Sequence, residues 1–300
     1  MIHSSNGSGM ETGGVRYSYN DIRQSSEEAK QKVLASFGLI EEEPKVTFRS
    51  LGKEMILDCI YLCVNYSSIV VITEIALVLL STFRDELLSA AISLAFTFQF
   101  IFVFSLNVGI SGALQTRVAR SFGKENFINM RRYLIQSLFM QILVLIIVYL
   151  PSVVYSYKLG LWVTKNPELS LLARDFLTYS FPGIVCHMIG EVLKSYCIAQ
   201  KVTKIFCYLN LISLFLFFML TRVFLLNFGW QMGGLALAYT FYAVMNLLAG
   251  LHVYTTLSRT QEVPSFNFSS VFKGFEEYIR YTLAFSATEW IFYLQMELIG

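Results

Sequence analysis

Long uncharged stretches, each able to cross a bilayer, dominate the sequence after about residue 50. A membrane-spanning helix needs about 20 apolar residues to cross a hydrocarbon layer of about 30 Å. Because the apolar positions run continuously and do not alternate with polar ones, they predict helices and not the strands of a β-barrel. Seven helices are expected, at 55–80, 87–116, 133–157, 169–193, 205–228, 232–258 and 281–300.

The basic residues between these stretches predict how the helices are oriented, because Lys and Arg are retained on the cytoplasmic side. Eleven of them occur in one set of alternating loops, and only three occur in the other. The N-terminus is therefore predicted to be cytoplasmic, and the seventh helix is predicted to leave the cytoplasm. The basic set is 117–132, 194–204 and 259–280, and the opposite set is 81–86, 158–168 and 229–231.

Composition agrees with a membrane protein. Of 300 residues, 55% are hydrophobic and 15% are charged, with a net charge of +2. These values argue against a soluble enzyme, a disordered protein or a nucleic-acid-binding protein. Residues 1–50 are polar and charged, without an apolar segment behind a basic start, so we do not expect a cleaved signal peptide there. We expect a cytosolic, largely disordered tail there, with room for a short helix at 26–40.

Carboxylates inside the predicted helices are the candidate functional groups. A charge near the bilayer centre costs about 2.5–3.5 kcal/mol on insertion scales, so such an acid is usually paired, protonated or placed in a cavity. Glu289 is expected near mid-depth, and Glu297 lies eight residues later on the same broad helix face. Glu74 is expected in the outer half of its helix. Contact with headgroups, water or a basic neighbour is the alternative for each.

These acids suggest a way to couple two ions. A low dielectric raises the pKa of a carboxyl group, and a nearby cation lowers it. A proton and a cationic substrate would therefore compete for the same carboxylate, which is the principle of a proton antiporter.

Two other sets of polar or reactive side chains have local explanations. Glu191 is followed by Lys194 at position i+3, which predicts an ion pair on one helix face near the cytoplasm. The five cysteines lie within or beside the predicted helices and form no metal-ligand pattern. We expect them to serve as small packing residues.

Several short motifs occur in order and at consistent spacing over about residues 50–300. They are Gly112-Ala113-Leu114-Gln115-Thr116 with 122–126 and 133–137, Phe181-Pro182-Gly183 with 191–194, Gly233-Gly234-Leu235-Ala236-Leu237-Ala238, and Glu289-Trp290. Together they resemble the second, fourth, sixth and seventh helices, with the adjoining loops, of multidrug and toxic compound extrusion (MATE) transporters.

The resemblance implies an all-α integral membrane protein. A MATE-like six-helix lobe would occupy 51–258, a cytoplasmic loop 259–280, and the first helix of a second lobe 281–300, with the rest of that lobe missing. The family's antiporters use two six-helix lobes, which rock to expose a site between them alternately to either side. They export organic cations or other amphiphilic compounds in exchange for H⁺ or Na⁺.

The resemblance also implies which molecules the protein binds. The position of Glu289, Glu74 and Glu297 within predicted membrane helices, and not the resemblance alone, makes them the candidates for binding the proton or cation. No cofactor is expected beyond the coupling ion, and no enzyme activity. The expected partners are a small organic cation and the lipid bilayer, with no nucleic acid, in a monomer of the plasma membrane or an organelle membrane.

Two positions depart from the family pattern. Plant and animal members usually carry a second acid five residues after the first on helix seven, where this sequence has Leu294. The glycine-rich end of the first helix is replaced by Ser81-Thr82-Phe83-Arg84-Asp85.

Three alternative functions were weighed. A lipid flippase of related architecture would have a similar sequence pattern. A seven-helix receptor fits the helix number, but its N-terminus would lie outside and its usual motifs on helices three and seven are missing. A rhomboid-like intramembrane protease would use Ser111, within Gly109-Ile110-Ser111-Gly112, with His252 as the base. Glycines in such a motif more often allow close helix packing.

Overall fold

The computed structural model describes residues 48–81, 86–260, 272 and 274–299. Within these ranges the regular structure is helical throughout, without strands. The elements are α2 (Phe48–Ser81), α3 (Glu86–Gln99), η1 (Phe100–Phe104), α4 (Ser105–Phe122), α5 (Phe127–Val144), η2 (Leu145–Tyr149), α6 (Leu150–Thr164), α7 (Pro167–Ile198), α8 (Thr203–Arg222), η3 (Val223–Asn227), α9 (Gln231–Thr260) and α10 (Phe275–Ile299). Most of the predicted tail, including 26–40, lies outside the described residues.

Six helices in the described part of the chain are long and apolar enough to cross a membrane, and they correspond to the first six predicted helices. This confirms the all-α membrane fold. Several extend a few residues past the uncharged stretches because a helix can continue into water beyond the hydrocarbon layer. The spans are Gly52–Ser81, Glu86–Phe122, Phe127–Thr164, Pro167–Ile198, Thr203–Leu225 and Met232–Ser258.

The seventh predicted helix is present as α10, but it begins at Phe275 and not near residue 281. Its first turn carries Glu276 and Glu277, whose negative charges are favourable at a helix N-terminus. Arg280 donates to Glu276 at 2.7 Å, one turn away. These charges favour helix over 275–280, where a loop was expected. That α10 crosses the membrane stays a prediction.

Short polar sequences set the turns between the spans. The side-chain oxygen of Asn126 accepts a bond from the backbone N–H of Asn129, which caps α5. Asn166 caps α7 in the same way, and Pro167 follows at the first helical position. The π-helical turn η2 ends at Tyr149, two residues before Pro151, which has no N–H to donate to the helix ladder.

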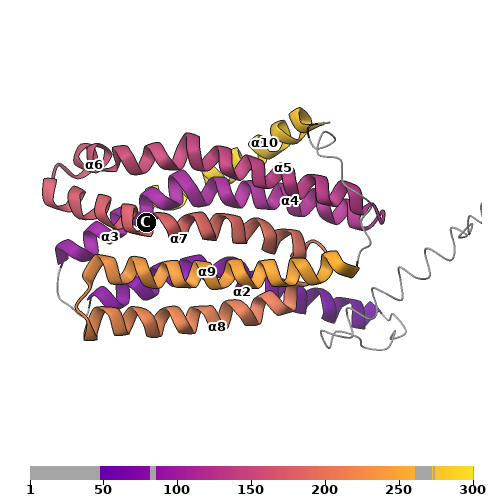
Figure 1. Ribbon diagram of the computed structural model, residues 1–300, viewed down its shortest axis with the longest axis horizontal. Coiled ribbons are helices and arrows are strands. Elements are labelled where there is room, and N and C mark those ends of the chain that lie inside the picture. Colours follow the sequence, from indigo (N-terminus) through magenta and orange to yellow (C-terminus); the bar gives the residue numbers. More distant parts are fainter. Residues whose placement is uncertain (1–47, 82–85, 261–271, 273, 300) are drawn as a thin grey trace, which may run out of the picture.

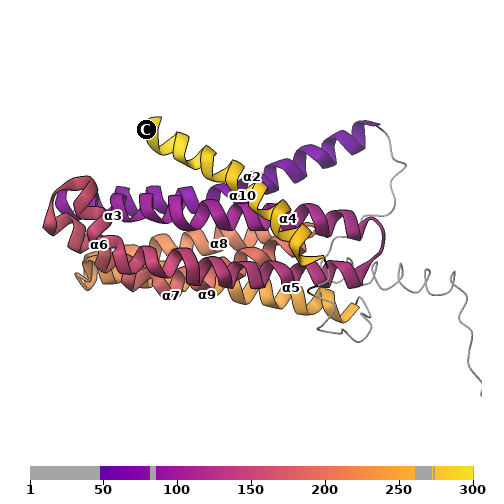
Figure 2. The same ribbon diagram turned by 90° about the horizontal axis from the view of Figure 1, so that it is seen from above.

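Helix α7 lies at the centre of the bundle, packed against α9, α6, α3 and α4 (Figure 1). Phe176 on α7, Phe104 on η1 and Tyr239 on α9 are almost completely buried in this core. In Figure 2, α10 crosses α4, and its C-terminal end leaves the bundle on the side where α2 also projects. The bundle therefore presents one face to α10 and leaves α10 only partly covered.

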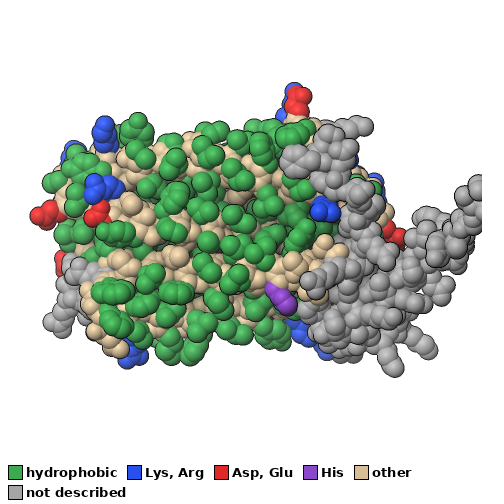
Figure 3. Space-filling model, in the orientation of Figure 1, with side chains coloured by type: hydrophobic (Ala, Val, Ile, Leu, Met, Phe, Trp, Pro, Cys, Tyr) green, Lys and Arg blue, Asp and Glu red, His purple; other side chains and the backbone are tan. Residues whose placement is uncertain are grey.

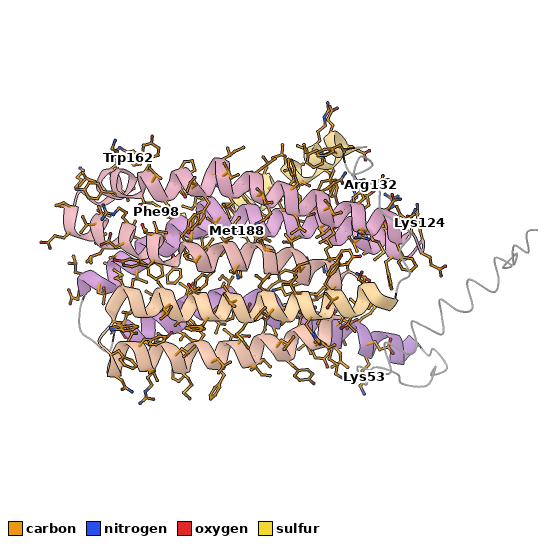
Figure 4. All side chains as sticks on the ribbon, viewed as in Figure 1. Lys53, Phe98, Lys124, Arg132, Trp162 and Met188 are labelled. Atoms are coloured by element: carbon orange, nitrogen blue, oxygen red, sulfur yellow. The ribbon has the colours of Figure 1, made fainter. Side chains whose placement is uncertain are left out.

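The surface is divided as expected for a membrane protein. Hydrophobic side chains cover the middle of the visible face, and charged side chains lie at its two ends (Figure 3). Lys53, Lys124 and Arg132 share one end, whereas Trp162 lies at the other (Figure 4). The three labelled basic residues thus lie together, as the orientation prediction requires.

Candidate functional site

A cavity of about 360 Å³ lies where α10 crosses the bundle. Its walls come from four long helices and one π-helical turn, so no single segment of the sequence contains it. The lining residues are Asn65, Tyr66, Ser68 and Ile69 of α2, Phe104 of η1, Asn107, Val108, Gly112 and Gln115 of α4, His187 and Glu191 of α7, and Phe285 and Glu289 of α10.

Two buried amide pairs fix the polar wall of this cavity. Asn210 on α8 donates to the side-chain oxygen of Asn65 at 2.6 Å. Gln141 on α5 donates to the side-chain oxygen of Asn107 at 2.8 Å. All four side chains are about 1% exposed. Because each amide is held by a partner from another helix, the wall is a fixed polar surface inside an apolar bundle.

The rest of the wall is aromatic. The hydroxyl of Tyr66 donates to the side-chain oxygen of Gln115 at 2.7 Å and ties α2 to α4. The ring of His187 packs edge-on against Phe104, with 5.4 Å between the ring centroids. Rings beside amides suit an organic cation, which gains from contact with aromatic faces and from polar oxygens.

Two carboxylates face the cavity in different electrostatic settings. Glu191 forms an ion pair with Lys194 at 2.5 Å, and the two side chains are 12% and 8% exposed. Glu289 is half-buried and forms no ion pair among the described side chains. One carboxylate is therefore already neutralised within the protein, and the other is available to a proton or cation.

Helix α10 reaches the cavity because α4 presents small residues to it. A Cβ atom built on Gly109 would overlap Ser286, and one built on Gly112 would lie 2.5 Å from the ring of Phe285. The Gly109 contact requires glycine because the neighbouring atoms include backbone, so the two backbones approach closely there, whereas at Gly112 the ring of Phe285 would have to move. Glu289 follows Ser286 by three residues, and this contact therefore sets where its carboxylate lies.

Nearer its N-terminus, α10 is held by polar contacts. The Arg117 guanidinium donates to Glu277 at 3.0 Å and lies 4.8 Å from the ring centroid of Tyr281. The hydroxyls of Tyr278 and Ser137 form a buried hydrogen bond. These contacts keep the first turns of α10 against α4 and α5.

Comparison with known proteins agrees with this architecture. The sequence profile of the MatE family matches residues 61–223, which is more than half of the 300 residues. The chain belongs to the MATE family. Protein DETOXIFICATION 3 and Protein DETOXIFICATION 6 of Arabidopsis thaliana are 23% and 22% identical to it over 219 residues. These alignments cover 71% of this MATE chain but only 45% and 44% of the two relatives.

Solved MATE structures share the fold. The crystal structure of the eukaryotic MATE transporter AtDTX14 superposes with a TM-score of 0.72 at 17% identity, over 92% of this chain and 56% of that one. An outward-facing multidrug resistance MATE transporter of the MOP superfamily superposes with a TM-score of 0.64 at 16% identity. This superposition covers 80% of this chain and 52% of that one. This MATE chain thus spans about half the length of its relatives and contains the fold of one part of them.

Of the three predicted site residues, the described part of the structure places one, Glu289, at the cavity. Glu289 lines the cavity, as residue 15 of the 25 in α10. Glu74 is exposed on α2 and lies outside the cavity. Glu297 belongs to α10, but its side chain lies outside the described part. The predicted ion pair of Glu191 with Lys194 is confirmed, and Glu191 also lines the cavity, which was not expected.

Sequence reasoning missed the polar residues that share the cavity with Glu289. A usable signal was present, because they lie at helical spacing within stretches that are otherwise apolar. His187 and Glu191 lie four residues apart on α7, and Asn107 and Gln115 lie eight residues apart on α4. A polar stripe of this kind is costly in lipid and marks the side of a helix that faces a cavity or another helix.

The serine motif weighed as a protease site has a packing role in this MATE chain. Its two glycines contact α10, and Ser111 between them is 1% exposed. His252 is exposed on α9. Membership of the MATE family argues against both the protease and the receptor interpretations.

Proposed function

We propose that this chain forms part of a secondary antiporter that exports organic cations or other amphiphilic compounds in exchange for protons or sodium ions. The observation that carries the proposal is the cavity between α10 and the bundle, where Glu289 has no ionic partner among the described side chains. A carboxylate in such a position binds either a proton or a cation, because both compete for the same negative charge.

The arrangement of the bundle supports alternating access. In this proposal residues 51–258 form one lobe, and α10 is the first helix of a second lobe that moves against it. The cavity lies at that boundary, so relative motion would open it toward one side of the membrane or the other. Glu74 and Glu297 stay candidate ion-binding residues on the same two elements, α2 and α10.

The proposed orientation follows from charge. The end of the bundle that carries Lys53, Lys124 and Arg132 would face the cytoplasm, with the tail on the same side (Figure 4). The transporter would work as a monomer in the plasma membrane or an organelle membrane. It would need no cofactor beyond the coupling ion and would catalyse no chemical reaction.

The test is efflux of a fluorescent organic cation from vesicles that contain the full-length protein, with an imposed pH or sodium gradient. Glu289→Gln keeps the shape of the side chain and removes its charge. We expect gradient-driven efflux to fall by about tenfold or more, since the neutral amide no longer attracts the cation and a loss of about 1.4 kcal/mol in binding corresponds to a tenfold loss of affinity. The matched control is Glu276→Gln on the same helix, whose side chain is 79% exposed, and it should stay near wild type.

Two results decide the proposal. Efflux that is unchanged in Glu289→Gln removes this carboxylate from the mechanism. Efflux driven by a sodium gradient and not by a pH gradient identifies sodium as the coupling ion, and the reverse identifies the proton.

A further inference from the structure

The charge balance of the cavity depends on a residue that does not line it. Glu191 and Glu289 are the two acidic side chains among the lining residues, and no lysine or arginine is among them. Lys194 lies behind Glu191, 2.5 Å from its carboxylate and 7% exposed. It has no other ionic partner in the described part of the chain.

We propose that Lys194 determines the charge class of the substrate. By neutralising Glu191 it leaves the cavity with one net negative charge, that of Glu289, and it thereby weakens the attraction of the site for divalent organic cations relative to monovalent ones. The inference rests on the proposed function, and it adds a specificity-determining residue that acts through Glu191 without touching the substrate.

The geometry makes this neutralisation durable. Two opposite charges that are both almost fully buried attract more strongly than exposed ones, because little water screens them. Removing one partner of such a pair is costly, since the other is left unpaired in a poorly solvated site. The position of Lys194, one turn after Glu191 on α7, keeps the ammonium group tethered whether or not the cavity is occupied.

His187 also lines the cavity and has to be included in the charge balance. Its ring packs against Phe104 and lies 6.3 Å from the ring centroid of Tyr239. Imidazole has an ordinary pKa of about 6.5, so a measurement at pH 8.5 leaves this side chain uncharged.

Three variants separate charge from structure. Lys194→Met frees the charge of Glu191 and gives the cavity two negative charges. Glu191→Gln leaves the ammonium group without its partner and reduces the net charge of the site to about zero. The double variant Glu191→Gln/Lys194→Met removes both charges together and restores the single negative charge of the wild type.

The experiment is a competition assay at pH 8.5 on the purified full-length protein. A fluorescent organic cation is displaced by a mono-quaternary or a bis-quaternary alkylammonium ion of matched alkyl length. One additional charge at about 10 Å and an effective dielectric of about 20 changes affinity by roughly tenfold per unit of ligand charge. We therefore expect Lys194→Met to shift the affinity ratio about tenfold toward the dication. Glu191→Gln should shift it in the opposite direction, and the double variant should return to the wild-type ratio.

The outcomes are distinguishable. A wild-type protein that binds neither ammonium ion overturns the proposed function and this inference with it. The inference alone is overturned if the wild type binds both ammonium ions but the affinity ratio does not depend on the charge of the site. In that case the ratios of Lys194→Met and Glu191→Gln would stay within about twofold of the wild-type ratio. If Lys194→Met does not fold, Glu191→Gln and the double variant still show in which direction the affinity ratio changes. A purely structural role for Lys194 predicts that this ratio does not follow the charge of the site.

Discussion

The contact between α4 and α10 yields the sharpest prediction about the packing of the fold. Gly109→Ala adds one Cβ atom, which would lie 2.7 Å from the Cβ atom of Ser286 and closer still to its backbone. Backbone atoms cannot turn away as a flexible side chain can. The substitution therefore has to move α10 away from α4.

The magnitude follows from the overlap. Non-bonded carbon atoms normally lie about 3.5–4.0 Å apart, so the two helices must separate by about 1 Å. Overpacking of this kind costs about 1–3 kcal/mol. Alanine in place of glycine within a helix returns about 0.5–1 kcal/mol. The expected net loss of stability is thus about 0.5–2 kcal/mol.

The assay compares thermal unfolding of Gly109→Ala with that of Gly250→Ala in the purified protein. Gly250 is also buried in a helix, but its added Cβ would lie 3.4 Å from the Cβ of Leu193, an ordinary contact. We expect Gly250→Ala to melt at or above the wild-type temperature and Gly109→Ala to melt below it. Equal melting temperatures for the two variants would refute the packing argument.

Two further predictions concern buried and terminal hydrogen bonds. Asn107→Leu leaves the Gln141 amide without its acceptor and should lower the free energy of unfolding by about 1–3 kcal/mol. Adding Gln141→Leu should recover most of this stability, because no buried amide is then left unpaired. A double variant that melts no higher than Asn107→Leu contradicts this prediction. Asn166→Ala removes the side-chain acceptor of the Glu168 and Leu169 backbone N–H groups at 3.0 and 3.3 Å. It should lower the free energy of unfolding by about 0.5–2 kcal/mol. Asn166→Asp keeps a side-chain acceptor and should not lower it, and thermal melting of both variants tests this difference.

The membrane helices could be predicted because lipid imposes a strict rule on the sequence. Charged residues are excluded from the hydrocarbon layer, so each span appears as a gap in the charge pattern. The rule says nothing about where a helix ends in water. Helix α6 therefore runs on to Thr164, past the expected end at residue 157, and α10 begins early at Phe275.

The cavity was only partly predictable for a different reason. Glu289 could be found from its depth alone, because an acid far from both ends of an apolar helix has few explanations. The spacing of Asn107 and Gln115 marks one face of α4, but neither this spacing nor Asn65 shows that a cavity is present, since an amide in a membrane helix also serves ordinary helix packing. Their place in the site depends on the rotation of α2 and α4 against α7, which one helix sequence does not specify. Glu191 was explained by Lys194, and that correct local explanation concealed its second contact.

The two carboxylates of the cavity belong to different moving parts in the proposed mechanism. Glu191 is fixed within the bundle by Lys194, whereas Glu289 moves with α10. A cation between them therefore feels a field that depends on how closely α10 lies against α4. If the cation binds more tightly when α10 lies in this position, linkage requires that the bound cation stabilises α10 in this position by the same free energy. Gly109→Ala, which displaces α10, should accordingly weaken binding of an organic cation as well as lower the melting temperature. Unchanged cation affinity in a destabilised Gly109→Ala protein would show that the cavity and the α4–α10 contact are not coupled.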